Sequence, residues 1–187
     1  MLLFVGLGNP TPDSENNRHN VGFKIIDSIN KKFGLSKQKP KFKGLLTTGI
    51  VGDQKVYAIK PLTFMNNSGI CIRELIEYFK IDPEDVIVFH DDLDVKFGKI
   101  KAKFGGSSAG HNGITSIDKF IGKDYSRVRI GIGKPKEKIE VGDFVLQNFD
   151  EDEMTGIEKI SKNINEAISI LVEKKLDLFS STVNNNK

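Results

Sequence analysis

Residues 86–92 read VIVFHDD, an apolar run that leads into a histidine and two carboxylates. A continuous apolar run of this length is typical of a strand that is buried on both faces of a sheet. Ligands of open α/β sheets bind outside the carboxyl ends of the strands. The stretch therefore predicts a central strand whose polar end, from His90 to Asp92, opens into a binding site.

Segments with strand and helix patterns alternate on both sides of residues 86–92. The apolar periodicity predicts strands at 2–8 and 126–133, a hairpin from 45–51 and 55–60 around the turn at Gly52, and helices at 21–34, 70–80 and 110–122. Asn67 and Ser68 are candidate caps for the helix at 70–80. The alternation favours a single α/β domain over residues 1–187, with a mixed, mostly parallel twisted sheet sandwiched between helices.

The segment after Asp150 carries a clear helical pattern. Asp150 and Glu153 form a candidate capping box at its start. The apolar residues that follow share one helical stripe: Met154, Ile157, Ile160, Ile164, Ile168 and Leu171. Residues 180–187, SSTVNNNK, have little apolar surface to bury, and we expect them to form a disordered tail.

Composition sets limits on the class of protein. With 187 residues, 38% of them hydrophobic, the chain is long enough for one sizeable core. Cys71 is the single cysteine, which excludes an intrachain disulfide and a multi-cysteine metal site, and its apolar surroundings predict an inert packed thiol. No apolar run approaches the roughly 20 residues of a membrane helix, and the start MLLFVG is too short for a secretory signal. We therefore expect a soluble, cytoplasmic protein.

The charge alone does not identify a partner. A net charge of +3 is too small to indicate a nucleic-acid partner, so the placement of the basic residues matters more. Lysines crowd residues 96–103, and Arg127 and Arg129 alternate in the strand that follows. On the sequence alone, a solvated strand face is the alternative explanation of the lysine run.

Two glycine-rich stretches are possible phosphate-binding loops. GLGNP, at 6–10, lacks the third glycine of a dinucleotide fingerprint, because Thr11 stands in that place. GGSSAG, at 105–110, lacks the Lys-Ser/Thr ending of a P-loop. The first stretch is better explained as a strand that ends in a bend and presents the amide of Asn9 at the mouth of the sheet.

Four short polar segments could converge at that edge of the sheet. They combine histidine or asparagine with glycine or carboxylates: Arg18-His19-Asn20, residues 64–69 (FMNNSG), residues 110–113 (GHNG) and His90-Asp91-Asp92. This set suits a water molecule activated by histidine, with an aspartate that fixes the imidazole tautomer and amides that donate to an oxyanion. No Gly-x-Ser-x-Gly nucleophile motif is present.

Each of these residues also has a structural explanation. His19 could be a helix cap or a solvated ring, and Asn66 and Asn67 could be cap residues. Asp91 and Asp92 could cap a turn or hold Mg²⁺. A metal held by the three histidines is a further alternative, although no local ligand spacing supports it.

Taken together, the motifs resemble those of a known family. VGLGNP, RHNVGF, KPLTFMNNSG, VFHDDLDVKFGKIK, GGSSAGHNG and RVRIGIG occur in register over residues 3 to 149, and the pattern is similar to bacterial peptidyl-tRNA hydrolases of the Pth family. The resemblance implies a monomeric α/β enzyme that hydrolyses the ester between a peptide and the 3′ ribose of tRNA, without metal or cofactor.

The resemblance also implies roles for individual residues. His19 would be the base that activates water, and Asp91 would orient it. The cleft that holds the peptide and the attacking water would be lined by three amides: Asn9, Asn66 and Asn112. The 5′ phosphate of the tRNA would be bound by Lys103 and Arg129, with Lys101 as a weaker candidate. Such contacts position RNA without reading its bases.

The chain departs from the family pattern near the first motif. Thr11 replaces a usual glycine, Ser14 a usual tyrosine, and Asn17 a common threonine, which puts the substrate contacts of that loop in doubt. Two other classes of function stay open on the sequence: a noncatalytic RNA-binding module that uses Lys101, Lys103 and Arg129, and a nucleotide-dependent oxidoreductase at GLGNP.

Overall fold

The computed structural model describes residues 1–186. The strands are β1 (Leu2–Gly6), β2 (Lys39–Lys41), β3 (Gly44–Val51), β4 (Gln54–Pro61), β5 (Val86–Asp92), β6 (Ile100–Phe104) and β7 (Ser126–Gly131). The helices are α1 (Val21–Phe33), α2 (Ser68–Phe79), α3 (Asn112–Ile121), α4 (Val141–Val145), α5 (Glu151–Glu166), α6 (Ile168–Val172) and α7 (Leu176–Asn185). Short 3-10 turns at Pro12–Ser14, Arg18–Asn20, Met65–Asn67 and Pro83–Asp85 complete the described elements.

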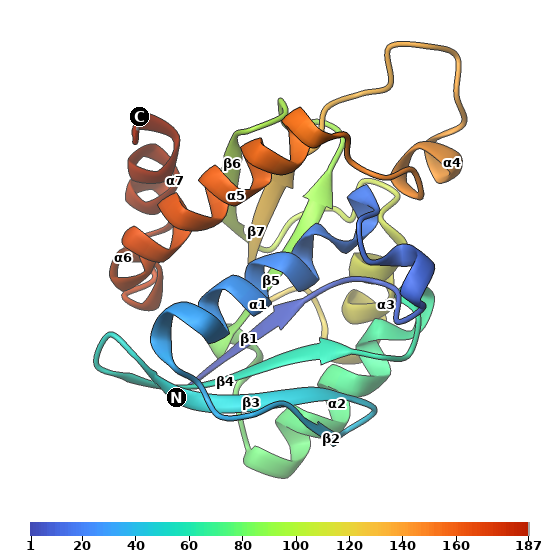
Figure 1. Cartoon of the computed structure of the whole chain (residues 1–187). Helices are drawn as coiled ribbons and strands as arrows, with labels where there is room; N and C mark the ends of the chain where they lie inside the picture. The colour runs from blue at the N-terminus through green and yellow to red at the C-terminus, as the bar shows by residue number, and fades with distance from the viewer. Residues whose placement is uncertain (187) are drawn as a thin grey trace.

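All the strands form one sheet in the order β2-β3-β4-β1-β5-β7-β6 (Figure 1). The four inner strands β4, β1, β5 and β7 are parallel, whereas β2, β3 and β6 join antiparallel at the two edges. The β3–β4 hairpin forms around Gly52 as the sequence predicts. The predicted mixed α/β sheet is confirmed, and β5 lies in its interior, so the carboxyl end of β5 opens among the loops of its neighbours.

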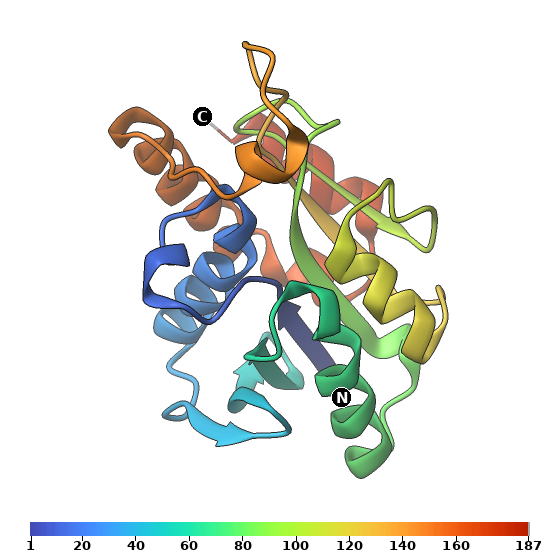
Figure 2. The ribbon, with the colours of Figure 1, turned by 90° about the vertical axis from the view of Figure 1, so that its right-hand side faces the viewer.

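Helices cover both faces of the sheet (Figure 1, Figure 2). One core cluster lies under α1, α5 and the C-terminal helices, and it includes Phe4, Phe89 and Val128. The other lies under α2 and α3, and it includes Val5 and Val88. Adjacent residues of β1 and β5 thus alternate between two buried layers, which explains why these strands are apolar throughout.

The glycines of GLGNP allow close packing between β1 and α1. A Cβ atom on Gly6 would lie 2.3 Å from the carbonyl oxygen of Gly22, and one on Gly22 would lie 2.4 Å from the carbonyl oxygen of Phe89. A larger residue at either position would force the helix away from the sheet. The structure therefore gives the first glycine motif a packing explanation and supplies no support for a nucleotide-binding loop.

The C-terminal segment differs from the expected disordered tail. Residues 180–185 belong to α7, and this helix buries its own side chains Phe179 and Val183 in the core. The side chain of Asn184 accepts a hydrogen bond from the Ile100 N–H and donates one to the Ile100 carbonyl, and Ser180 Oγ accepts one from the Ala102 N–H. The prediction was wrong because polar side chains in this tail satisfy the free edge of β6. Lys187 lies outside the described residues.

Three local predictions need correction. The helix after Asp150 ends at Glu166, and its apolar stripe continues in α6 after a break at Ala167. Asp150 does cap α5 by accepting from the Glu153 N–H, but the Glu153 carboxylate binds Arg18 and does not close the capping box. Neither Asn67 nor Ser68 caps α2 through its side chain; Ser68 Oγ donates to the Met65 carbonyl instead.

Within residues 1–186, no helix has both the length and the apolar character that a membrane crossing requires.

Candidate active site

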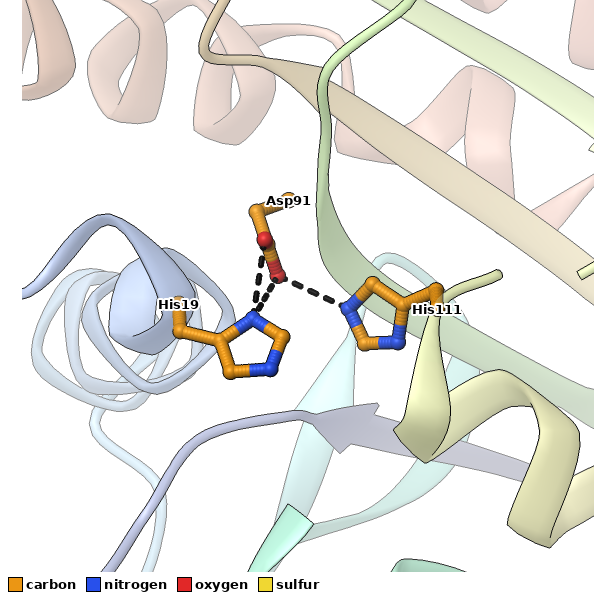
Figure 3. A group of neighbouring side chains, drawn as sticks. All are labelled: His19, Asp91 and His111. Atoms are coloured by element: carbon orange, nitrogen blue, oxygen red, sulfur yellow. Dashed lines mark hydrogen bonds and ion pairs between the residues drawn. The ribbon is translucent and has the colours of Figure 1, made fainter. Parts of the chain in front are cut away.

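Three side chains from distant segments meet at the carboxyl end of β5 (Figure 3). His19 comes from the 3-10 turn before α1, Asp91 from the end of β5, and His111 from the N-cap position of α3. His19 Nδ1 lies 3.0 and 2.9 Å from the two carboxylate oxygens of Asp91, and His111 Nε2 lies 2.8 Å from Oδ1. The Asp91 carboxylate is thus shared by two imidazoles.

The backbone of α3 fixes the tautomer of His111. Its Nδ1 accepts hydrogen bonds from the Gly113 and Ile114 N–H groups at 3.1 and 3.3 Å, so the ring proton must be on Nε2. His111 therefore donates to Asp91. This assignment follows from the fixed direction of the backbone donors.

Asp91 is ionised in this setting. The carboxyl is 2% exposed, and burial by itself would raise its pKa. Electrostatic attraction to His111 and His19 and hydrogen bonds from both rings outweigh burial, and they hold the pKa of Asp91 well below its usual range. An ionised Asp91 requires a donor on His19 Nδ1, which leaves Nε2 of His19 with its lone pair.

The spacing of His19, Asp91 and His111 could suit a metal ion, because their ligand atoms lie within 4.8 Å of one another. The hydrogen bonds of His111 argue against that use. An imidazole that accepts at Nδ1 carries its proton on Nε2, so its Nε2 cannot also donate a lone pair to a metal. The Mg²⁺ alternative for Asp91 and Asp92 also loses support, since Asp92 binds Arg129.

His19 lines two adjoining clefts. The first, of about 430 Å³, contains the three predicted amides and residues of two loops and α4: Asn9, Thr11, Ser14, Phe64, Met65, Asn66, Asn112, Gly142, Val145 and Leu146. The second, of about 740 Å³, extends past Asp91 and His111 toward Asp92, Asp94, Ser108 and Lys134. A larger cavity, of about 1080 Å³, lies between residues 93–97 and 133–139 and includes neither His19 nor Asp91. We therefore place the candidate site at the first two clefts.

The amides of the first cleft are held in different ways. Asn9 Oδ1 accepts from the Met65 N–H at 2.9 Å, which fixes the Asn9 amide at the end of β1. Asn66 and Asn112 are exposed, and their side chains make no hydrogen bond to the rest of residues 1–186. The structure thus brings Asn9, Asn66 and Asn112 to one cleft with His19, and the Nδ2 groups of all three make no hydrogen bond within residues 1–186.

Arg18 anchors the turn that carries His19. Its guanidinium donates to both oxygens of Glu153 at 3.1 and 3.0 Å and to the Asn148 carbonyl, and it stacks 4.4 Å from the Phe144 ring centre. These contacts fasten the His19 turn to α4 and α5. Sequence reasoning missed this role, and the position of Glu153 on α5 gave no signal for it.

The other residues that sequence reasoning underestimated are nearer the chemistry. The sequence indicated His111 only as part of GHNG and as a possible metal ligand, because its contact with Asp91 depends on how α3 packs against β5. Thr11 and Ser14, the departures from the family pattern, form a side-chain hydrogen bond of 2.7 Å at the cleft wall. Asn17 donates to the Asn148 side chain, away from His19. Cys71 is buried, which raises the pKa of its thiol to about 12 and agrees with an inert residue.

The predicted phosphate-binding residues lie on the neighbouring strands. Lys101 and Lys103 of β6 point to the same face as Arg129 of β7, because Lys101 pairs with Arg129 and Lys103 with Arg127 in the antiparallel register. Arg127 itself is buried and bound to Asp118 and the Ser107 carbonyl, so it has a structural role. Lys103 is half-buried and Lys101 is exposed.

Known proteins with the same sequence pattern and fold share one description. The family model described as peptidyl-tRNA hydrolase matches residues 3–187. A peptidyl-tRNA hydrolase of Pelagibacter ubique is 82% identical over 99% of this chain and 100% of that protein, and one of Bacillus subtilis is 42% identical over 96% and 97%. The crystal structure of peptidyl-tRNA hydrolase from Acinetobacter baumannii superposes with a TM-score of 0.92 at 33% identity, covering 100% of this chain and 96% of that one. The chain therefore belongs to the peptidyl-tRNA hydrolase family.

Proposed function

We propose that this chain hydrolyses the ester bond between the peptide and the 3′ ribose of peptidyl-tRNA, with His19 as the general base. The observation that carries the proposal is the pairing of His19 Nδ1 with the buried, ionised Asp91. This pairing leaves His19 Nε2 as a proton acceptor at a residue that lines both clefts.

The reaction needs two proton transfers. A water molecule in the cleft gives a proton to His19 Nε2 while its oxygen attacks the ester carbonyl carbon, and Asp91 stabilises the imidazolium that forms. The imidazolium then returns the proton to the 3′ oxygen of the ribose as the bond between that oxygen and the carbonyl carbon breaks. The free amides of Asn66 and Asn112 would donate to the tetrahedral oxyanion and to the peptide backbone.

The arrangement favours direct attack by water over a covalent intermediate. The thiol of Cys71 is buried and protonated, and the hydroxyl of Ser14 is bonded to Thr11. Neither Cys71 nor Ser14 makes a hydrogen bond to His19, the contact that a nucleophile activated by this base requires.

The RNA part of the substrate would bind beside the second cleft. Lys103 and Arg129 offer two cations for a backbone phosphate, and Lys101 adds a weaker, exposed one. The family resemblance implies a monomer, and a peptidyl-tRNA substrate suits a location in the cytoplasm with the translation machinery.

The test is cleavage of N-acetyl-aminoacyl-tRNA by the wild type and by His19→Ala, each with EDTA present. We expect the wild type to cleave under chelation, and the variant to lose about 10²–10⁴-fold in kcat because the base is missing. The melting temperature and the affinity for deacylated tRNA should stay close to those of the wild type, which separates lost chemistry from lost folding.

Three results would count against the proposal. Equal cleavage by His19→Ala would remove His19 as the base. Loss of wild-type cleavage with EDTA, restored by added metal, would show a metal-dependent mechanism. Salt-dependent tRNA binding without any ester cleavage would favour the noncatalytic RNA-binding module instead.

A further inference from the structure

Asp91 and Asp92 are consecutive on β5 and therefore point to opposite faces of the sheet. Asp91 contacts His19 on the α1 side. Asp92 contacts Arg129 of β7 on the α3 side, where Arg129 Nε donates to Asp92 Oδ2 at 2.7 Å. The proposed reaction uses Asp91 alone, so the role of Asp92 needs an explanation of its own.

Asp92 occupies one edge of the Arg129 guanidinium. The Nε donor of Arg129 is taken by Asp92, and the two Nη groups make no hydrogen bond to the rest of residues 1–186. The Arg129 side chain is 16% exposed. The carboxylate therefore holds the planar group in one orientation and leaves its outer donors for a ligand.

The Asp92 carboxylate is itself fixed in place. Its second oxygen accepts a hydrogen bond from the Asp94 N–H at 2.8 Å. Burial would raise the pKa of Asp92, but the hydrogen bonds from Arg129 and the Asp94 N–H lower it below the usual range, so the group is ionised. A ligand on Arg129 thus meets a negative charge that cannot swing away without losing two hydrogen bonds.

Lys103 is the uncompensated cation beside this pair. It makes no ion pair within residues 1–186, whereas Arg129 is neutralised by Asp92. Burial and the nearby charges of Arg129 and Arg127 lower the pKa of Lys103. The three side chains Asp92, Arg129 and Lys103 together carry a net charge of one positive unit. Without Asp92, the two basic side chains would present two positive charges to a phosphate.

We infer that Asp92 is a positioning residue and built-in counterion of the phosphate site: it orients Arg129 and limits the affinity for RNA, so that deacylated tRNA leaves after the ester is cleaved. The inference rests on the proposed function, because it requires Arg129 to bind RNA phosphate. Its chemical basis is competition between the Asp92 carboxylate and the RNA phosphate for the same guanidinium.

The test is the affinity of deacylated tRNA for Asp92→Asn, measured by fluorescence anisotropy over a range of salt concentrations. Asparagine can still accept from Arg129 Nε through its carbonyl oxygen, but it carries no charge and gives up the hydrogen bond from the Asp94 N–H. We expect binding to tighten about three- to tenfold at low salt, with a salt slope steeper by roughly one, since one more cation is free to displace counterions.

Three variants control for other causes. Asp94→Asn removes an exposed carboxylate two residues away and should change the affinity by less than about twofold. Asp92→Glu keeps the charge and should keep the wild-type salt slope. In Asp92→Asn/Arg129→Ala the gain from the first substitution should disappear, because Asp92 acts through Arg129.

The outcomes separate this inference from the proposed function. If Arg129→Ala weakens tRNA binding but Asp92→Asn leaves it unchanged or weaker, the counterion role is overturned and the phosphate site stands. If Arg129→Ala binds tRNA as tightly as the wild type, the phosphate site and the role of Asp92 both fall. Should Asp92→Asn fail to fold, Asp92→Ser takes its place as the uncharged variant, and binding of deacylated tRNA to Asp92→Ser that is no tighter than to the wild type would overturn the inference equally.

Discussion

The two carboxylates at the end of β5 are one residue apart and serve different neighbours. Asp91 is buried between two imidazoles, whereas Asp92 is half-buried against a guanidinium. Both are ionised, and in both the pKa is lowered by partners that outweigh burial. The difference lies in what the partners can do with a proton.

A histidine gains and loses a proton near neutral pH, whereas an arginine keeps its proton. The Asp91 side of the strand can therefore take part in proton transfer, and the Asp92 side can only arrange fixed charges. The pleat of one strand thus divides the proposed site into a part that can transfer protons and a part with fixed charges.

The largest effect that tests this division is expected for Asp91→Asn. An asparagine amide can donate to His19 Nδ1 and so favour the tautomer that carries its proton on Nε2, where the base must accept one. The single-turnover rate of ester cleavage should fall about 10²–10⁴-fold with the fold intact. A loss smaller than tenfold would mean that the chemistry does not depend on Asp91.

A second test uses His90, which shares the Asp92 face but is sealed from solvent. Its Nδ1 donates to the Asp91 carbonyl, and burial together with His111 lowers its pKa to about 3. The unfolded imidazole titrates near pH 6.5, so between these values the unfolded chain binds a proton that the folded chain does not. Stability should therefore fall as the pH drops from about 6.5 toward 3, with a contribution of up to about 1.4 kcal/mol per pH unit.

Urea unfolding at pH 7.5 and pH 5 checks this contribution. His90→Asn keeps a donor for the Asp91 carbonyl but does not titrate, so it should lose less stability than the wild type over that interval. Identical losses in the two proteins would show that His90 is charged in the folded state, and the Asp92 face would then also hold a titrating group.

The smallest effects are expected on the side that we propose to bind phosphate. Lys103→Ala should raise KM for peptidyl-tRNA about tenfold, because a charge-assisted hydrogen bond is lost, and should leave the single-turnover rate at saturation close to wild type. Lys101→Ala, at an exposed position on the same strand, should raise KM less than about twofold. A larger effect on KM for Lys101→Ala than for Lys103→Ala would indicate that the RNA binds nearer the start of β6, at Lys101.

Much of the fold is encoded locally and was predictable. The apolar run at 86–92, the turn at Gly52 and the stripe after Asp150 each depend on neighbours in the sequence. The tail at 180–185 was not predictable in this way, because its polar residues are explained by the unpaired edge of β6, about 80 residues earlier in the chain.

The candidate site also combines residues that the sequence indicates with contacts that depend on distant segments. The sequence motifs, through their family resemblance, indicated His19, Asp91 and the three amides, and the structure brings His19 and the amides to one cleft, with Asp91 hydrogen-bonded to His19. The ion pair of Arg18 with Glu153 spans 135 residues, and no local pattern announces it.

The amino-acid sequence by itself determined the order of strands and helices, the buried central strand and the kinds of side chain available for the chemistry. Only the tertiary structure decided that His111 donates to Asp91, that Arg18 fastens the turn of His19 to α5, and that Asp92 faces Arg129. The reason is physical: side-chain periodicity is a property of a few consecutive residues, whereas hydrogen-bond partners depend on the phase in which separate elements pack against one another.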